Sequence, residues 1–194
     1  MPKVEQICYT IGMKHWDLVQ QAALDSHGII TFAQAKDLGI FPAEIYRWCK
    51  TGRIMKVARG VFRLMSYPSQ GMISNMATLL ASVGDGSYLY GESALAFLGL
   101  CPTRPYVATV AVPRRIRKHL DKGVSVVKAA SGYRPYYHSG IACQHPRDAI
   151  RSSIGVLEAV RLGEAVDEAE RLGYFTQKEA DELRKDVNNG KTTS

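Results

Sequence analysis

Cysteine is scarce in this sequence, and the four cysteines present, Cys8, Cys49, Cys101 and Cys143, lie far apart. They form no Cys-x-x-Cys pair, so we expect reduced thiols rather than a zinc ribbon or a disulfide framework. No stretch approaches the roughly 18 uninterrupted apolar residues of a membrane span. The N-terminal segment MPKVEQICYTIG also lacks the basic-then-apolar order of a secretory signal. We therefore expect a cytoplasmic protein with no membrane partner.

Signals of catalysis are equally few. The segment GESAL lacks the last glycine of the Gly-x-Ser-x-Gly nucleophile elbow and indicates the start of a packed helix. No Gly-x-x-x-x-Gly-Lys-Ser/Thr loop is present, and no pair of strand carboxylates suggests a two-metal nucleotidyltransferase site. His138, Cys143 and His145 are close in sequence but lack the paired spacing of structural zinc ligands. The sequence predicts a protein that is not an enzyme and that needs no cofactor and no metal.

What the sequence does have is positive charge, unevenly distributed. The 194 residues are 46% apolar, which is enough for a proper core, and carry a net charge of +7 with a pI near 9.3. Residues 1–70 carry +4, residues 71–150 carry +5 and residues 151–194 carry −2. This asymmetry is compatible with a polyanionic partner for the first three-quarters of the chain.

Apolar spacing in the first 50 residues predicts three helices, over 15–26, 31–38 and 42–50. Thr31 is a suitable N-cap for the second helix, and Gly39 supplies the sharp exit that a helix-turn-helix needs. The third helix has two distinct faces. Its core stripe is predicted to contain Ile45, Trp48 and Cys49, and its other side Ala43, Tyr46, Arg47 and Lys50.

The next segment, CKTGRIMKVARGVFRLM, predicts a β-hairpin that turns at Arg59 and Gly60. A two-residue loop pairs Ala58 with Val61 and places Lys56 opposite Arg63. Like charges that face each other across a ladder repel, so this register suggests an anion nearby. Two alternatives remain: the cations extend into water and protect a sheet edge, or the loop is wider with Gly60 at a bulge.

Three helices followed by a basic hairpin is the element order of a winged helix-turn-helix. In that arrangement the third helix enters the major groove, where an Arg can reach guanine, and hairpin cations contact phosphate. Each cation could instead belong to a solvated face. Together and in this order, they predict DNA binding.

The rest of the chain predicts an α+β fold that ends in helices. We expect a winged helix-turn-helix domain over 1–66, a linker over 67–71 because Pro68 and Gly71 interrupt it, and a second domain over 72–194. Its expected helices lie at 72–84, 92–100, 154–173 and 176–187, the last capped by Thr176, and its expected strands lie at 105–113, 123–129 and around 137–143.

Two charged segments of the second domain remain open to two interpretations. The basic run PRRIRKH contains Arg114, Arg115, Arg117 and Lys118, which either extend a DNA footprint or form a solvated loop. The acidic residues Glu164, Asp167, Glu168 and Glu170 of the C-terminal helices fit a solvated helical face or a protein-binding surface.

Several motifs resemble a known family. GIITFAQAKDLGI followed by IYRWCKTGRIMKVARGVFRL resembles the N-terminal winged-helix domain of AbiEi-family antitoxins, from abortive-infection type IV toxin-antitoxin systems. YLYGESALAFLGL, VAVPRR and HPRDAI are similar to the second domain of that family. The resemblance implies a transcriptional repressor that binds inverted repeats in its own promoter, as a monomer or dimer. It also implies that the protein offsets a nucleotidyltransferase toxin without necessarily binding it.

The resemblance places recognition-helix contacts at Arg47 and Lys50, and wing contacts at Lys56, Arg59 and Arg63. The alternative function is a protein-interaction module that binds a toxin or another partner through the C-terminal domain. The full set of candidate DNA-binding residues is Thr31, Ala43, Tyr46, Arg47, Lys50, Lys56, Arg59, Arg63, Arg114, Arg115, Arg117 and Lys118.

Overall fold

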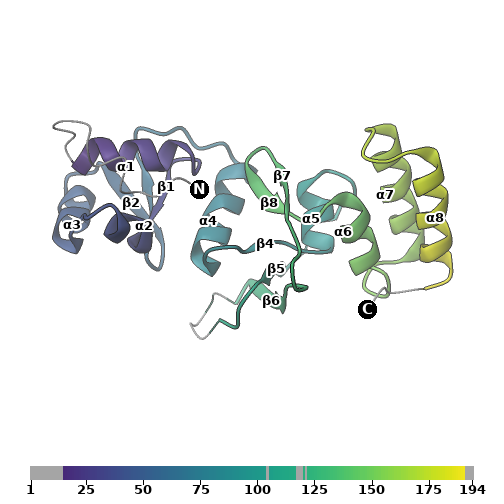
Figure 1. The fold of residues 1–194 in the computed structure, drawn as a ribbon. Helices are drawn as coiled ribbons and strands as arrows, with labels where there is room; N and C mark the ends of the chain where they lie inside the picture. The colour runs from purple at the N-terminus through teal and green to yellow at the C-terminus, as the bar shows by residue number, and fades with distance from the viewer. Residues whose placement is uncertain (1–14, 104, 117–119, 121, 191–194) are drawn as a thin grey trace. The chain divides into compact units, whose positions relative to one another are not determined.

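The computed structural model describes residues 15–103, 105–116, 120 and 122–190 (Figure 1). The chain forms two compact units, Met1–Ser82 and Val83–Ser194, called unit 1 and unit 2 below. Helix α4 (Met72–Val83) lies almost entirely in the first of these. The linker predicted over 67–71 precedes α4, and its role as a domain boundary stays a prediction.

Unit 1 is built from short helices around a three-stranded antiparallel sheet. Its elements before α4 are α1 (His15–Leu24), β1 (Ile29–Thr31), α2 (Phe32–Asp37), α3 (Pro42–Lys50), β2 (Ile54–Ala58) and β3 (Val61–Leu64). The sheet order is β1-β3-β2, so the hairpin of β2 and β3 pairs with a strand that lies between the first two helices. This is the arrangement of a winged helix-turn-helix, with the hairpin as the wing, and it confirms the predicted fold class.

The ends of the helices follow from local chemistry. The Thr31 hydroxyl accepts a hydrogen bond from the Gln34 N–H at 3.2 Å, and the Gln34 side-chain oxygen accepts one from the Thr31 N–H at 2.8 Å. This reciprocal capping box confirms Thr31 as the N-cap of α2. At Gly39 the backbone has φ +75°, a conformation that glycine adopts without steric cost, and the chain turns there into α3.

The core of unit 1 joins one face of each of α1, α2 and α3 to the sheet. Its fully buried members are Val19, Ala23, Ile30, Ala35, Ile40, Ile45, Trp48, Ile54, Phe62 and Leu64. Trp16 and Trp48 meet edge to face with ring centroids 5.2 Å apart, which fixes α1 against α3. Phe62 meets Phe32 in the same manner at 4.8 Å, and this contact fixes α2 against the wing.

The wing turns where the sequence predicts, but its register is different. Ala58 pairs with Val61 as expected; a bulge between Lys56 and Ala58 then places Lys56 opposite Phe62 and Met55 opposite Arg63. The predicted opposition of Lys56 and Arg63 is therefore wrong, because the bulge adds one residue to β2. The repulsion inferred from that opposition does not arise in this register. The exposure of the wing cations is therefore the observation that supports anion binding by the wing.

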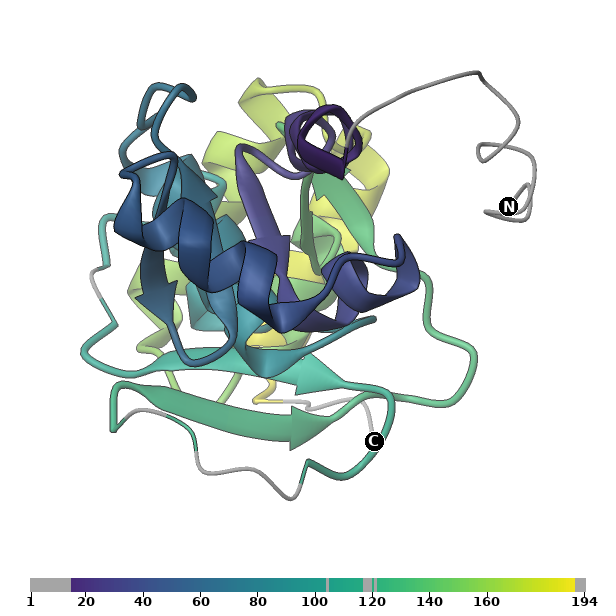
Figure 2. The same ribbon diagram turned by 90° about the vertical axis from the view of Figure 1, so that its left-hand side faces the viewer.

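In its described residues, unit 2 combines a mixed five-stranded sheet with four helices. In chain order its elements are β4 (Tyr88–Leu89), α5 (Glu92–Phe97), β5 (Ala108–Val112), β6 (Val124–Lys128), β7 (Tyr136–His138), β8 (Ile141–Cys143), α6 (Pro146–Ser152), α7 (Ala159–Arg171) and α8 (Gln177–Asn188). The strand order is β6-β5-β4-β8-β7. Figure 2 shows β5 and β6 side by side and running in the same direction, as their parallel pairing requires.

The predicted elements of unit 2 are largely present, with four differences. The strand expected around 137–143 is a hairpin of β7 and β8, which turns at Ser139 and Gly140 with φ of +46° and +77°. Strand β4 and helix α6 were not predicted. The helix expected over 154–173 begins only at Ala159, since the chain turns at Gly155 with φ +81°. Thr176 caps α8 as predicted, accepting from the Glu179 N–H.

His145 makes the stability of unit 2 depend on pH. Its side chain caps α6 by accepting the Arg147 N–H at 3.4 Å, and burial lowers the pKa of the imidazole below its ordinary value. As the pH falls, the unfolded chain therefore binds a proton at this histidine before the folded chain does. The contribution of His145 to the stability of unit 2 is fully present above about pH 6.5 and is lost as the pH drops below that value. We expect chemical denaturation followed by far-UV circular dichroism to show a less stable unit 2 at pH 5.5 than at pH 7.5. His145→Asn keeps a capping oxygen without a titrating group, so it should reduce the difference in stability between pH 5.5 and pH 7.5. If that difference is unchanged, His145 is not the source of the pH dependence.

Candidate nucleic-acid interface

The candidate interface of unit 1 is formed by α3 and the wing, where positive charge is concentrated. Between Pro42 and Leu64 the chain carries six cations and a single acid, Glu44. The cations are Arg47, Lys50, Arg53, Lys56, Arg59 and Arg63. All except the half-buried Arg63 are exposed, so this surface is strongly positive.

Helix α3 presents one apolar and one polar face, as predicted. Ile45 and Trp48 are buried, whereas Ala43, Tyr46, Arg47 and Lys50 are exposed. The Arg47 side chain is 66% exposed. The Tyr46 ring is 57% exposed, and its edge-to-face contact with Phe32 at 6.0 Å limits its orientations. The exposed face thus pairs a guanidinium with a positioned phenol.

Glu44 links α3 to α1 and to Arg47. Its carboxylate lies 2.7 Å from His15 Nδ1 and 3.6 Å from the Arg47 guanidinium, and it accepts the Phe41 N–H that begins the helix. Burial raises the pKa of the Glu44 carboxyl, but the hydrogen bonds from His15 and Phe41 and the nearby positive charges outweigh this and hold the pKa below its ordinary value. The carboxylate is therefore charged at neutral pH and stabilises the N-terminal turn of α3.

In the wing, Lys56 and Arg59 point into solvent from β2 and from the turn, and Gly60 closes the turn with φ +74°. Arg63 lies on the central strand, between Ile29 of β1 and Met55 of β2.

One exposed cation of this surface was not assigned a role from the sequence. Arg53, between α3 and β2, holds its guanidinium 5.1 Å from the centre of the Trp16 ring, a cation–π contact. The basic residues close to Arg53 in the sequence were the only signal that could have indicated that it belongs to this surface.

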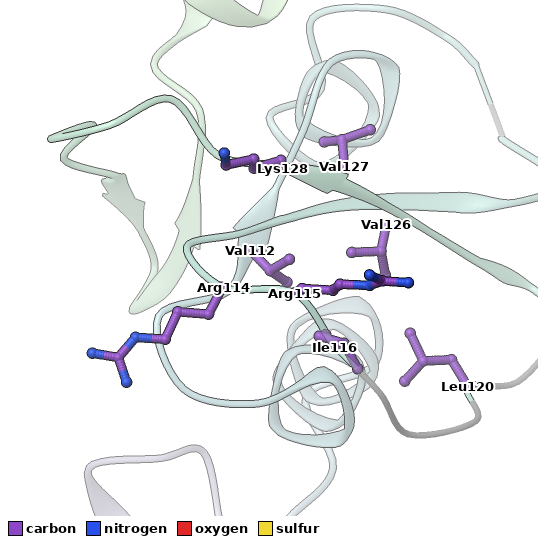
Figure 3. Close-up of a pocket in the computed structure, with 8 residues that line it drawn as sticks. All are labelled: Val112, Arg114, Arg115, Ile116, Leu120, Val126, Val127 and Lys128. Atoms are coloured by element: carbon purple, nitrogen blue, oxygen red, sulfur yellow. The ribbon is translucent and has the colours of Figure 1, made fainter.

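The other predicted contacts belong to other segments of the chain than α3 and the wing. The Thr31 hydroxyl is engaged in the capping box of α2. Arg114 and Arg115 belong to unit 2, where they border a hollow beside Val112, Ile116 and Val126 (Figure 3). Arg117 and Lys118 lie outside the described residues.

The residues considered as metal ligands have other partners. His138 contacts the Phe97 ring, His145 caps α6 and contacts Tyr136, and the Cys143 side chain is fully buried. Burial raises the pKa of the Cys143 thiol to about 12, so it is protonated at neutral pH. Within the described parts of the chain, no group of three or more His, Cys, Asp or Glu residues is arranged to hold a metal ion.

The acidic helices at the C-terminus neutralise much of their own charge. Arg184 of α8 contacts Asp167 and Glu170 of α7 at 2.6 Å each and Asp181 of its own helix at 2.9 Å. Arg171 pairs with Glu168 at 2.6 Å. Three of the four acids singled out in the sequence, Asp167, Glu168 and Glu170, therefore serve ion pairs within this helical pair.

The comparison with known families bears on the same segment that forms the positive surface. Residues 17–64 match the family of transcriptional regulators described as AbiEi antitoxins. The match runs from α1 to the end of β3 and so contains α3 and the whole wing. It confirms the resemblance to AbiEi antitoxins for the motifs of unit 1, and the resemblance of the motifs after residue 64 stays a prediction. No curated protein matches the chain, and no helix in the described ranges is long and apolar enough to cross a membrane.

Proposed function

We propose that this protein is a DNA-binding transcriptional repressor of the AbiEi antitoxin type. The observation that carries the proposal is the exposed row of Tyr46, Arg47 and Lys50 on α3, beside a cationic wing and within the matched segment. In a winged helix-turn-helix this helix enters the major groove while the wing follows the phosphate backbone. The family match over residues 17–64 supports the further proposal that the protein represses its own operon at inverted repeats and counteracts a nucleotidyltransferase toxin.

The proposal assigns different tasks to the two sets of cations. Arg47 donates to a guanine edge, because a guanidinium matches the two acceptors that guanine presents in the major groove. Lys50, Lys56, Arg59 and Arg63 contact phosphates and set the position of the protein on the duplex. Arg114 and Arg115 are proposed as phosphate contacts from unit 2. The internal ion pairs of Asp167, Glu170 and Asp181 with Arg184 favour this function over the alternative of a partner-binding acidic surface.

Arg47→Ala tests the assignment of base recognition. We expect the ratio of affinities for the DNA upstream of the gene and for scrambled DNA to fall by about 10- to 100-fold, the effect of losing one bidentate base contact. Fluorescence anisotropy with both duplexes measures this ratio. Arg161→Ala removes an exposed arginine from α7 and serves as the matched control, with no change expected in the ratio. Equal losses on both duplexes for Arg47→Ala would remove its assigned role.

A further inference from the structure

A second site is indicated by a hollow of about 730 Å³ in unit 2. We call it the tyrosine hollow and define it by Tyr88, Pro113, Lys128, Tyr133 and Tyr137 together with the loop 129–132. Its volume lies within the range of about 300–1,000 Å³ that is typical of pockets for small molecules. The proposed DNA-binding function makes no use of its tyrosines.

The topology of the sheet creates this hollow. Strands β5 and β6 are parallel, and Val112 pairs with Lys128, so both strands end at the same edge of the sheet. The chain then leaves β6 at one side of the sheet and crosses to β7 at the other side. Ligands of sheets with parallel strands bind outside the carboxyl ends, where successive connections diverge. The tyrosine hollow lies at such a place, between the end of β5 and the crossing loop.

The aromatic part of the hollow is held in place before any ligand arrives. Tyr133, at the end of the crossing loop, stacks on Tyr88 with ring centroids 5.1 Å apart and planes at 23°. The Tyr133 hydroxyl donates to Asp148 Oδ2 at 3.0 Å and accepts from the His145 N–H at 3.2 Å. Tyr137 on β7 is 65% exposed and offers a ring for stacking. A fixed aromatic floor with one open ring is suited to a flat ligand.

The rim of the hollow carries a positive charge, because Lys128 lines it directly. Figure 3 shows the Lys128 side chain directed away from Val112 and Val126. Among the described residues, no carboxylate forms an ion pair with Lys128. The ammonium group of Lys128 is thus available to an anionic group of a ligand.

We propose that the tyrosine hollow binds a nucleotide, with its base stacked on Tyr137 and its phosphate contacted by Lys128. A nucleotide joins a planar ring to a charged phosphate, and the hollow offers an aromatic surface and a cation at one site. Base stacking on an aromatic side chain contributes about 1–3 kcal/mol, and lysine and arginine are the usual partners of phosphate. The nucleotide is either free or the phosphorylated 5′ end of a single strand, since both present the same chemistry.

Isothermal titration calorimetry of the full chain with the four deoxynucleoside 5′-monophosphates tests the proposal. We expect saturable binding of at least one nucleotide, and at least tenfold weaker binding of its nucleoside and of inorganic phosphate. Oligonucleotides with and without a 5′-phosphate then distinguish the two sources: a strand that binds more tightly than the mononucleotide identifies a strand end, and a weaker one identifies the free nucleotide. No saturable binding of any mononucleotide or phosphorylated strand up to millimolar concentration would overturn the proposal.

Two substitutions on the surface locate the site. Tyr137→Ala and Lys128→Gln should each weaken nucleotide binding about tenfold, and neither should unfold the protein because both side chains are exposed. Tyr106→Ala, at a side chain that is 99% exposed, and Lys122→Gln are matched controls outside the hollow and should change the affinity less than twofold. Equal effects of Tyr137→Ala and Tyr106→Ala contradict the assignment. Duplex binding by Tyr137→Ala, measured in parallel, separates this site from the proposed repressor function.

Discussion

Phe62→Ala is expected to lower the free energy of unfolding of unit 1 by about 3–5 kcal/mol, the usual effect of removing a buried phenylalanine ring. Phe62 is 1% exposed and lies on β3, the central strand of the sheet. Its ring contacts Phe32, which in turn contacts Tyr46 of α3. The cavity therefore affects both the wing and the helix proposed to enter DNA.

Tryptophan fluorescence can follow this unfolding in unit 1 alone. The chain has two tryptophans, and both Trp16 and Trp48 pack in this unit. Met65→Ala, at the end of the same hairpin but 53% exposed, is the control and should cost less than about 0.5 kcal/mol. If Phe62→Ala lowers the free energy of unfolding by less than about 1.5 kcal/mol, Phe62 does not join the wing to the helices.

Gly28→Ala is expected to destabilise the same unit by about 3 kcal/mol, because it combines backbone strain with a steric clash. Gly28 has φ +76°, and a Cβ there would lie 2.6 Å from Cγ and 2.7 Å from Cβ of Tyr67. These atoms form the base of the Tyr67 side chain, so the whole ring must move away from the core that it contacts. The Gly28 carbonyl also accepts the Leu64 N–H, and a shift of this backbone would disturb the end of β3.

Gly39→Ala provides a matched control for Gly28→Ala. Gly39 has nearly the same φ, +75°, with no atom within 4 Å of the added Cβ. It should cost only the strain of the left-handed conformation, about 1–2 kcal/mol. The difference between the two variants, measured by urea denaturation with tryptophan fluorescence, reports the clash with Tyr67. Equal losses in the free energy of unfolding would mean that the Tyr67 side chain can move away from the new Cβ without destabilising unit 1.

The parts of the fold that could be predicted from the sequence depend on local chemistry. The two faces of α3 follow from its period, and the caps at Thr31 and Thr176 follow from hydroxyls placed three residues before Gln34 and Glu179. The turn at Arg59 and Gly60 follows from the preference of glycine for positive φ. In each of these cases the decisive partner lies within four residues.

The parts that could not be predicted depend on partners distant in sequence. Strand β1 has three residues and exists because it pairs with β3, 30 to 34 residues away. The bulge in β2 leaves no signal in the alternation of its side chains, and it changed every pairing beyond Ala58. Strand β4 has two residues and is held between β5 and β8. Such short strands carry too few residues to show a period of two.

The candidate interface shows the same division. The exposure of Arg47 and Lys50 could be predicted from helical spacing. The exposure of the wing cations could be predicted only in part, from the hairpin pattern. The contact of Glu44 with His15 joins residues 29 positions apart, and the contact of Arg53 with Trp16 joins α1 to the segment after α3. No periodicity reports such contacts, because they depend on how the helices pack.

The most direct test of the central claim is the salt dependence of DNA binding, measured by fluorescence anisotropy with the DNA upstream of the gene. If the wing cations contact phosphates, Lys56→Ala and Arg63→Ala should each reduce the slope of log affinity against log salt by about 0.9. They should weaken binding to native and scrambled duplexes alike. Lys178→Ala, an exposed lysine of α8, changes the net charge equally and should leave the slope unchanged. Weak and equal binding to both duplexes by the unaltered protein, with slopes unaffected by Lys56→Ala and Arg63→Ala, would contradict the repressor function.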